Sequence, residues 1–89
     1  MDIKPVKAMK TAVVNLLPVS GPELLDINNR LNSTVSISAF DKENTDFDHK
    51  GLVGYIAGDI EKINSDDPET PDLWFINLAF FNENYKLVD

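Results

Sequence analysis

The chain has 89 residues, of which 43% are hydrophobic and 26% charged, and it contains no cysteine. This length and composition predict one soluble globular domain with a single core and argue against wholesale disorder. The lack of cysteine excludes disulfides, thiolate zinc sites and thiol catalysis, and a small chain without such cross-links is typical of the reducing cytoplasm.

The net charge of -7 is concentrated in the central third of the sequence. Residues 41–72 hold ten acids against Lys42, Lys50 and Lys62, whereas residues 1–10 carry a small positive excess. A field of this sign repels the phosphates of nucleic acids and of anionic membranes. The same field attracts a basic protein surface, so the charge predicts a protein partner and neither nucleic acid nor membrane.

The first apolar run, residues 11–17, fits a strand or a helix. It is too short for a signal peptide and stops at Pro18, so we place it within the fold. Val6, Met9 and Val13 would share one helical face, and Pro5 suits a first helical turn. We favour a strand over residues 10–17, with the helix as the alternative.

The clearest local signal is the Ser-x-x-Glu spacing of Ser20 and Glu23. In such a capping box the serine hydroxyl and the glutamate carboxylate each accept a bond from a backbone N–H at a helix start. Leu24, Ile27 and Leu31 then follow at helical spacing. The sequence therefore predicts a helix over residues 21–32.

The next segments alternate between strand and loop patterns. Residues 34–40 alternate apolar and polar side chains, which predicts a half-buried strand. Residues 41–50 are polar and end before Gly51, which predicts a loop. Residues 52–57 are apolar and predict a strand that bends or bulges near Gly54 or Gly58, with a continuation through Ile60 as an alternative to ending there.

Residues 73–81 hold the only tryptophan and three of the five phenylalanines. As a strand, this segment is apolar on both faces, which is typical of a central strand covered on both sides. The alternative is that Trp74 and Phe80 are left for a partner. Before it, residues 64–72 predict an exposed loop; after it, residues 82–84 predict a turn and residues 85–88 a short returning strand.

These elements predict an α+β domain, because one helix falls among several strands without a repeat. We expect a largely antiparallel four- to five-stranded sheet with the helix over residues 21–32 packed on a face. The domain spans residues 1–89 without a linker. The aromatic strand should lie centrally and the strand over residues 34–40 toward an edge.

The acidic segment matches the pattern of an EF-hand calcium loop only in part. Asp46, Asp48 and Gly51 fall at suitable offsets, but Lys50 occupies a ligand position and Ala57 stands where the closing glutamate is required. We therefore expect no metal site and no cofactor. His49 is the only histidine and lies in a polar segment without a triad signature, so we expect neither catalytic residues nor an enzyme.

The charge pattern favours a small cytoplasmic protein that blocks a basic, possibly nucleic-acid-binding, surface of a protein partner. This class includes inhibitors, immunity proteins, antitoxins and phage anti-restriction or anti-CRISPR proteins, some of which imitate DNA. The partner-binding residues predicted are Asp41, Glu43, Asp46, Asp48, Asp66, Asp67, Glu69 and Asp72. The alternative is a structural or assembly module, or a homodimer, that uses sheet edges and the apolar strand over residues 73–81.

Overall fold

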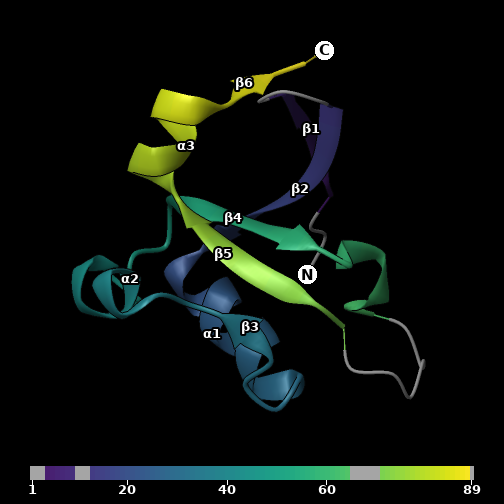
Figure 1. The fold of residues 1–89 in the computed structure, drawn as a ribbon. Coiled ribbons are helices and arrows are strands. Elements are labelled where there is room, and N and C mark those ends of the chain that lie inside the picture. Colours follow the sequence, from purple (N-terminus) through teal and green to yellow (C-terminus); the bar gives the residue numbers. More distant parts are fainter. Residues whose placement is uncertain (1–3, 10–12, 65–70, 89) are drawn as a thin grey trace.

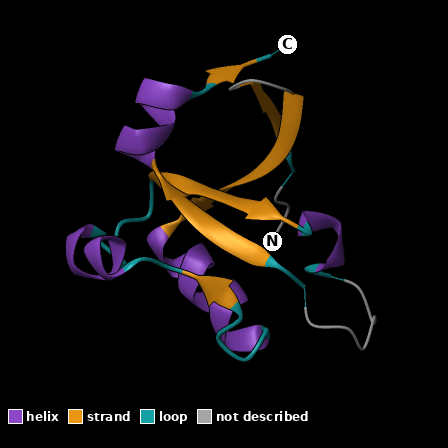
Figure 2. Cartoon of the chain, viewed as in Figure 1, coloured by secondary structure: helices purple, strands orange, loops and turns teal. Residues whose placement is uncertain are grey.

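A computed structural model describes residues 4–9, 13–64 and 71–88, and these contain six strands, three α-helices and a 3-10 helix (Figures 1 and 2). In chain order the elements are β1 (Val6–Met9), β2 (Val13–Ser20), α1 (Gly21–Arg30), β3 (Val35–Ser36), α2 (Ala39–Asn44), β4 (Leu52–Gly58), η1 (Ile60–Lys62), β5 (Leu73–Asn77), α3 (Leu78–Asn84) and β6 (Lys86–Leu87). None of the helices in these ranges has the length and apolar character that a membrane span requires.

The strands form one sheet in the order β3-β5-β4-β2-β1-β6. Neighbours are antiparallel except for β3 and β5, which run parallel. Since β3 and β6 have only two residues each, the four longer strands β1, β2, β4 and β5 form most of the sheet. The predicted α+β class with a largely antiparallel sheet is confirmed. Three α-helices rather than one accompany it in the described part of the chain.

Strand β2 joins two halves of the sheet. Its residues 13–16 pair with β1, whereas its residues 17–20 pair with β4. The predicted strand at this place is confirmed, but it continues through Pro18 to Ser20, and residues 10–12 lie outside the described part. Proline is tolerated here because residues 17–20 of β2 pair with β4 and not with β1, so Pro18 lies in an edge segment of the described sheet.

Helix α1 begins as predicted. The Glu23 carboxylate accepts a 2.8 Å bond from the Ser20 N–H, and the Ser20 hydroxyl accepts a 3.3 Å bond from the Glu23 N–H. Leu24 and Ile27 are fully buried against the sheet. The helix ends at Arg30, two residues before the predicted end, because Asn32 adopts a left-handed backbone conformation with a φ of 55°.

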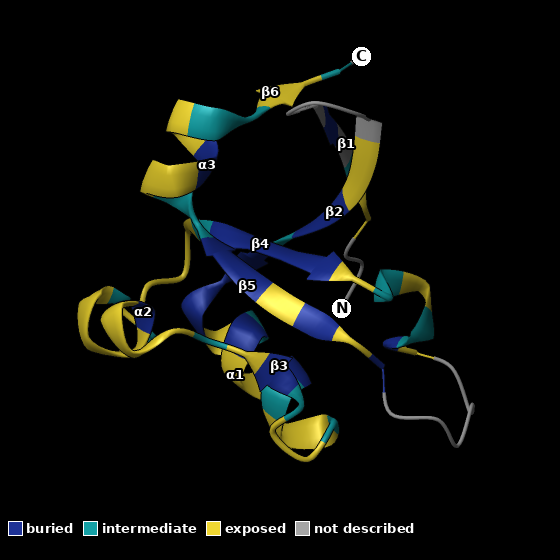
Figure 3. Cartoon of the chain, in the orientation of Figure 1, coloured by how far each residue is buried: buried dark blue, intermediate teal, exposed yellow. Residues whose placement is uncertain are grey.

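Buried side chains form two clusters, one on each face of the sheet. In Figure 3 most of β4 is coloured as buried. Because successive strand residues point to opposite faces, Leu17 and Ile56 belong to the cluster under α1, whereas Leu16 and Tyr55 belong to the other. Helix α3 covers part of this second face through Phe81, which is 5% exposed. The central strand β4 is thus apolar on both sides.

The strand predicted over residues 34–40 and the loop over residues 41–50 are wrong in part. Pairing stops at Ser36, and helix α2 begins at Ala39. The cause is local, since the Ser38 hydroxyl accepts a 3.1 Å bond from the Asp41 N–H and so caps the helix. Of the residues with the alternating pattern, only Val35 and Ser36 pair with another strand.

The nine-residue strand predicted over residues 73–81 is confirmed over residues 73–77 as β5 and wrong over residues 78–81. Strand β5 ends at Asn77, whose side-chain oxygen accepts a 2.7 Å bond from the Phe80 N–H and so starts α3. The turn predicted over residues 82–84 is therefore the last part of a helix. The short returning strand is confirmed as β6, which pairs with β1.

Strand β4 is confirmed and ends at Gly58 instead of running on through Ile60. Gly58 has a φ of +103°, a conformation that side chains disfavour, and the chain then turns into η1. Of the loop predicted over residues 64–72, residues 65–70 lie outside the described part.

Candidate functional site

The eight acids predicted to bind a partner do not share one environment. Asp66, Asp67 and Glu69 lie outside the described residues. Among the others, Asp41 is buried. The remaining four are exposed: Glu43, Asp46, Asp48 and Asp72.

Asp41 holds elements of the fold together. It is 7% exposed, and its carboxylate accepts a 2.8 Å bond from the Asn77 side-chain amide. This bond joins α2 to the junction between β5 and α3. Asp41 therefore has a structural role and does not contribute to the exposed acidic surface.

Glu43, Asp46 and Asp48 lie at the end of α2 and in the loop that follows it. The Asp46 carboxylate accepts a 3.0 Å bond from the Asp48 N–H, which closes a local turn. The Gly21 N–H donates a 2.9 Å bond to the His49 carbonyl, so the loop is fixed to the start of α1. His49 is exposed, and within the described residues no group of three His, Cys, Asp or Glu side chains could hold a metal ion.

The fourth exposed acid, Asp72, lies just before β5. Its N–H donates a 3.1 Å bond to the Asp59 carboxylate, and its carbonyl accepts a 2.9 Å bond from the Asp59 N–H. These bonds fix the start of β5 to the end of β4.

Three large aromatic side chains remain exposed: Phe40 is 67% exposed, Trp74 44% and Phe80 45%. Trp74 points away from the α1 face because Leu73 and Phe75, its neighbours in β5, point toward it. On the second face, α3 reaches Ile76 but leaves Trp74 half open. The sequence offered exposure of Trp74 and Phe80 as an alternative to burial. It placed Phe40 at the end of a predicted strand, whereas the structure places it in the short helix α2.

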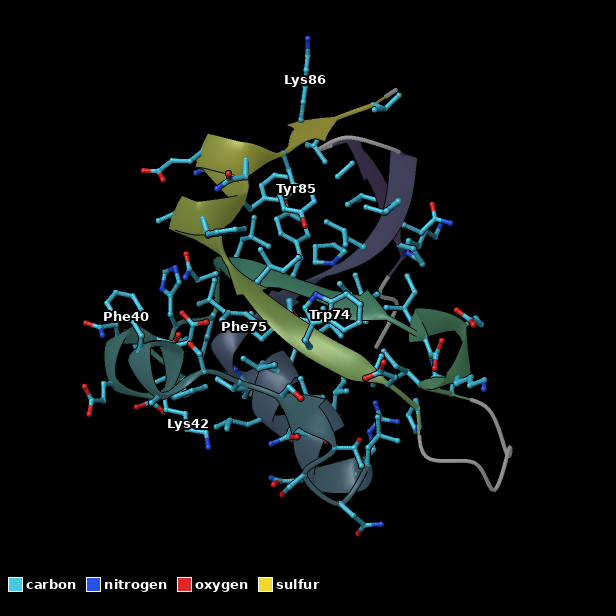
Figure 4. All side chains as sticks on the ribbon, in the orientation of Figure 1. Phe40, Lys42, Trp74, Phe75, Tyr85 and Lys86 are labelled. Atoms are coloured by element: carbon cyan, nitrogen blue, oxygen red, sulfur yellow. The ribbon has the colours of Figure 1, made fainter. Side chains whose placement is uncertain are left out.

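Two hollows flank Trp74. One, of about 430 Å³, lies between α2, β5 and α3 and is lined by Phe40, Asn77 and Phe80 among others. The other, of about 460 Å³, we call the Trp74 cavity; it is lined by Val14, Leu16, Ala57, Ile60, Glu61 and Trp74 among others. Trp74 and Tyr85 border both hollows, and Figure 4 shows these two side chains on the same side of the sheet.

Gly58 sets how closely the indole of Trp74 can lie to β4. A Cβ atom at Gly58 would collide with the Asp72 carbonyl oxygen and lie 3.0 Å from Cζ3 of Trp74. Because Ala57 pairs with Trp74, the ring lies over the end of β4. A side chain at position 58 would displace it.

A column of aromatic rings closes the second core behind this surface. The ring centroids of Tyr55 and Phe81 are 4.1 Å apart, and those of Phe81 and Tyr85 are 5.4 Å apart with nearly parallel planes. Burial raises the pKa of the Tyr55 hydroxyl above its usual value. The column supports Tyr85, which borders both hollows, from the core side.

The described surface thus offers exposed carboxylates and exposed aromatic rings, the groups that bind basic and apolar protein surfaces. No protein-family model matches the chain, and comparisons with curated proteins and with solved structures find no match.

Proposed function

We propose that this chain is a small acidic cytoplasmic binding protein, and not an enzyme, that covers a basic surface of a protein partner. The observation that supports the proposal most is the exposure of Glu43, Asp46 and Asp48 on one short stretch of a chain whose net charge is -7. Such a stretch attracts lysine and arginine side chains. A nuclease or another nucleic-acid-binding protein has a surface of this kind.

The role that follows is that of an inhibitor, immunity protein, antitoxin or phage anti-defence protein. By covering a groove that normally binds phosphates, it would exclude the nucleic acid. Attraction between opposite charges speeds association, and added salt screens it. The complex should therefore form fast and weaken steeply as salt increases.

The test compares two charge reversals, Glu43→Lys and Glu83→Lys. Both glutamates are exposed and both lie one residue before the end of a short helix, Glu43 in α2 and Glu83 in α3. The two variants therefore have the same net charge and differ in where it changes. We expect E43K to bind at least about tenfold more weakly than the wild type, and E83K to stay within about threefold of it.

Immobilised wild-type protein would first capture partners at about 50 mM salt from an extract of the native host. If a phage encodes the protein, the extract is that of the cell which the phage infects. Each captured protein would then be purified and its Kd measured for the wild type and both variants at about 50 and 500 mM salt. Binding that is unchanged by salt contradicts the proposal. Equal losses for E43K and E83K would show that the stretch around Glu43 is not the contact.

A second candidate is an assembly module that associates with copies of itself. The observation that favours it is the exposure of Phe40, Trp74 and Phe80 around one hollow. Burying such rings between two copies would remove apolar area from water. The mass in solution separates the two candidates.

A further inference from the structure

We propose that the Trp74 cavity is an anchor site that takes the cationic side chain of an arginine or lysine from the partner. This inference rests on the proposed function and adds where a basic partner is held. The aliphatic wall of the Trp74 cavity, the single charged side chain among its described lining residues and its aromatic border each favour such a cationic side chain.

The wall selects a ligand with an apolar stem. Val14, Leu16, Ala57 and Ile60 line the cavity with aliphatic groups. Arginine and lysine side chains bury their methylene groups along such surfaces while the charged head stays near water. The cavity volume of about 460 Å³ falls within the range of ligand sites, and it accommodates such a side chain with part of its backbone.

The charge selects a positive head. Of the described residues that line the cavity, Glu61 alone carries a formal charge. It belongs to η1, which is separated from β4 by Asp59 alone, so its backbone is fixed at the border of the cavity. An anionic ligand would meet this carboxylate and the field of a chain with a net charge of -7, whereas a cation is attracted by both.

The aromatic border adds a second interaction with a cation. Tryptophan is the aromatic side chain that binds cations best, at up to about 6 Å from the ring centre. Trp74 is 44% exposed and borders the cavity together with Tyr85. A planar guanidinium also stacks on such rings, so arginine should bind more tightly than lysine.

The site is fixed by regular structure. Trp74 lies in β5 and pairs with Ala57 of β4, and the ring packs over Gly58. The two bonds between Asp59 and Asp72 hold the ends of these strands together. The ring therefore needs no rearrangement of the backbone to receive a ligand.

The probe is a capped arginine, N-acetyl-arginine methylamide, and its comparison is the equally shaped but neutral capped citrulline. Because the chain has one tryptophan, its fluorescence reports on Trp74 alone. At constant ionic strength we expect a saturable fluorescence change with the arginine compound and about tenfold weaker binding of the citrulline compound. Equal binding of both compounds would overturn the proposal.

Two variants locate the interaction. We expect Glu61→Gln to weaken binding of the capped arginine about fivefold and Glu83→Gln, which removes the same charge from α3, to leave it unchanged. Trp74→Leu should abolish binding, which the amide NMR signals of Val14 and Ala57 report in this variant. Unchanged amide signals of Leu24 and Ile27, in the core on the opposite face of the sheet, verify folding in the absence of the probe.

Failure of this site is distinguishable from failure of the proposed function. If E83Q weakens binding as much as E61Q, the whole field of the protein attracts the probe and the cavity is not an anchor, while salt-dependent capture of a basic partner sensitive to E43K would stand. A fluorescence change absent at all probe concentrations also overturns the anchor. A dimer that buries Trp74 in the probe-free protein overturns it in favour of a second copy.

Discussion

At the scale of single residues, Tyr55 shows how tightly the second core is closed. Its side chain is 4% exposed although it carries a hydroxyl, and its ring packs against Phe81. Water cannot solvate a phenolate at this position as well as it does in the unfolded chain. Burial therefore raises the pKa of the hydroxyl above the usual value of 10.0.

This pKa shift predicts a loss of stability at alkaline pH. Below pH 10 the hydroxyl is protonated in both states, so its contribution is fully present. Above that value the unfolded chain releases the proton first, and the free energy of unfolding falls. In urea unfolding between about pH 9 and about pH 11, the wild type should lose more stability than Tyr55→Phe, which has no group to ionise. Parallel pH profiles would contradict the assignment of this effect to Tyr55.

At the scale of elements, two predicted strands end where a polar side chain caps a helix. Ser38 starts α2 and Asn77 starts α3. Asn77 has a second role, because its amide donates to the buried Asp41 carboxylate while its oxygen caps α3. One side chain thus joins β5, α2 and α3.

Removing both roles should destabilise the protein strongly. We expect Asn77→Ala to lower the free energy of unfolding by about 2–4 kcal/mol, because it removes a helix cap and leaves a buried carboxylate without its donor. Asn77→Ser keeps a capping hydroxyl but not the amide, so its loss should be intermediate. Urea unfolding followed by circular dichroism measures the free energy of unfolding of the wild type and of both variants.

The matched control for this experiment is Asn84→Ala. Asn84 is in the same helix, and its amide donates to the Phe80 carbonyl on the exposed side. Its replacement should cost about 0.5 kcal/mol or less. If N84A costs as much as N77A, general helix propensity and not the cap explains the loss.

At the scale of the whole molecule, the chain combines a net charge of -7 with aromatic rings that stay half exposed. These features act in opposite directions on self-association, because like charges repel two copies while apolar surface draws them together. The exposed Glu43 lies in α2, the helix that carries Phe40, and the exposed Asp46 and Asp48 lie in the loop that follows it. A second copy docking there would bring like charges together.

We therefore expect a monomer of 10.0 kDa in light scattering at about 50 mM salt. If salt of about 500 mM promotes a dimer, Phe40→Ser should suppress it, since Phe40 is the most exposed aromatic side chain described. A stable dimer whose mass is the same at both salt concentrations would favour the assembly module over the binder of basic surfaces.

The sequence alone determined the features that depend on neighbouring residues. The capping box at Ser20 and Glu23 fixed the start of α1. The apolar run from Leu52 predicted strand β4, although its end at Gly58 came from the structure. The missed helix starts at Ser38 and Asn77 were open to prediction by the same reasoning. In both places the apolar pattern of a strand continued past the cap and concealed it.

Only the tertiary structure decided which polar and apolar side chains reach the surface. Nothing local distinguishes the buried Asp41 from the exposed Glu43, since burial of Asp41 depends on Asn77, which lies 36 residues further along the chain. Nor does sequence show that α3 covers Ile76 and stops short of Trp74. Local capping bonds are set by adjacent residues, whereas exposure is set by elements that meet only after folding.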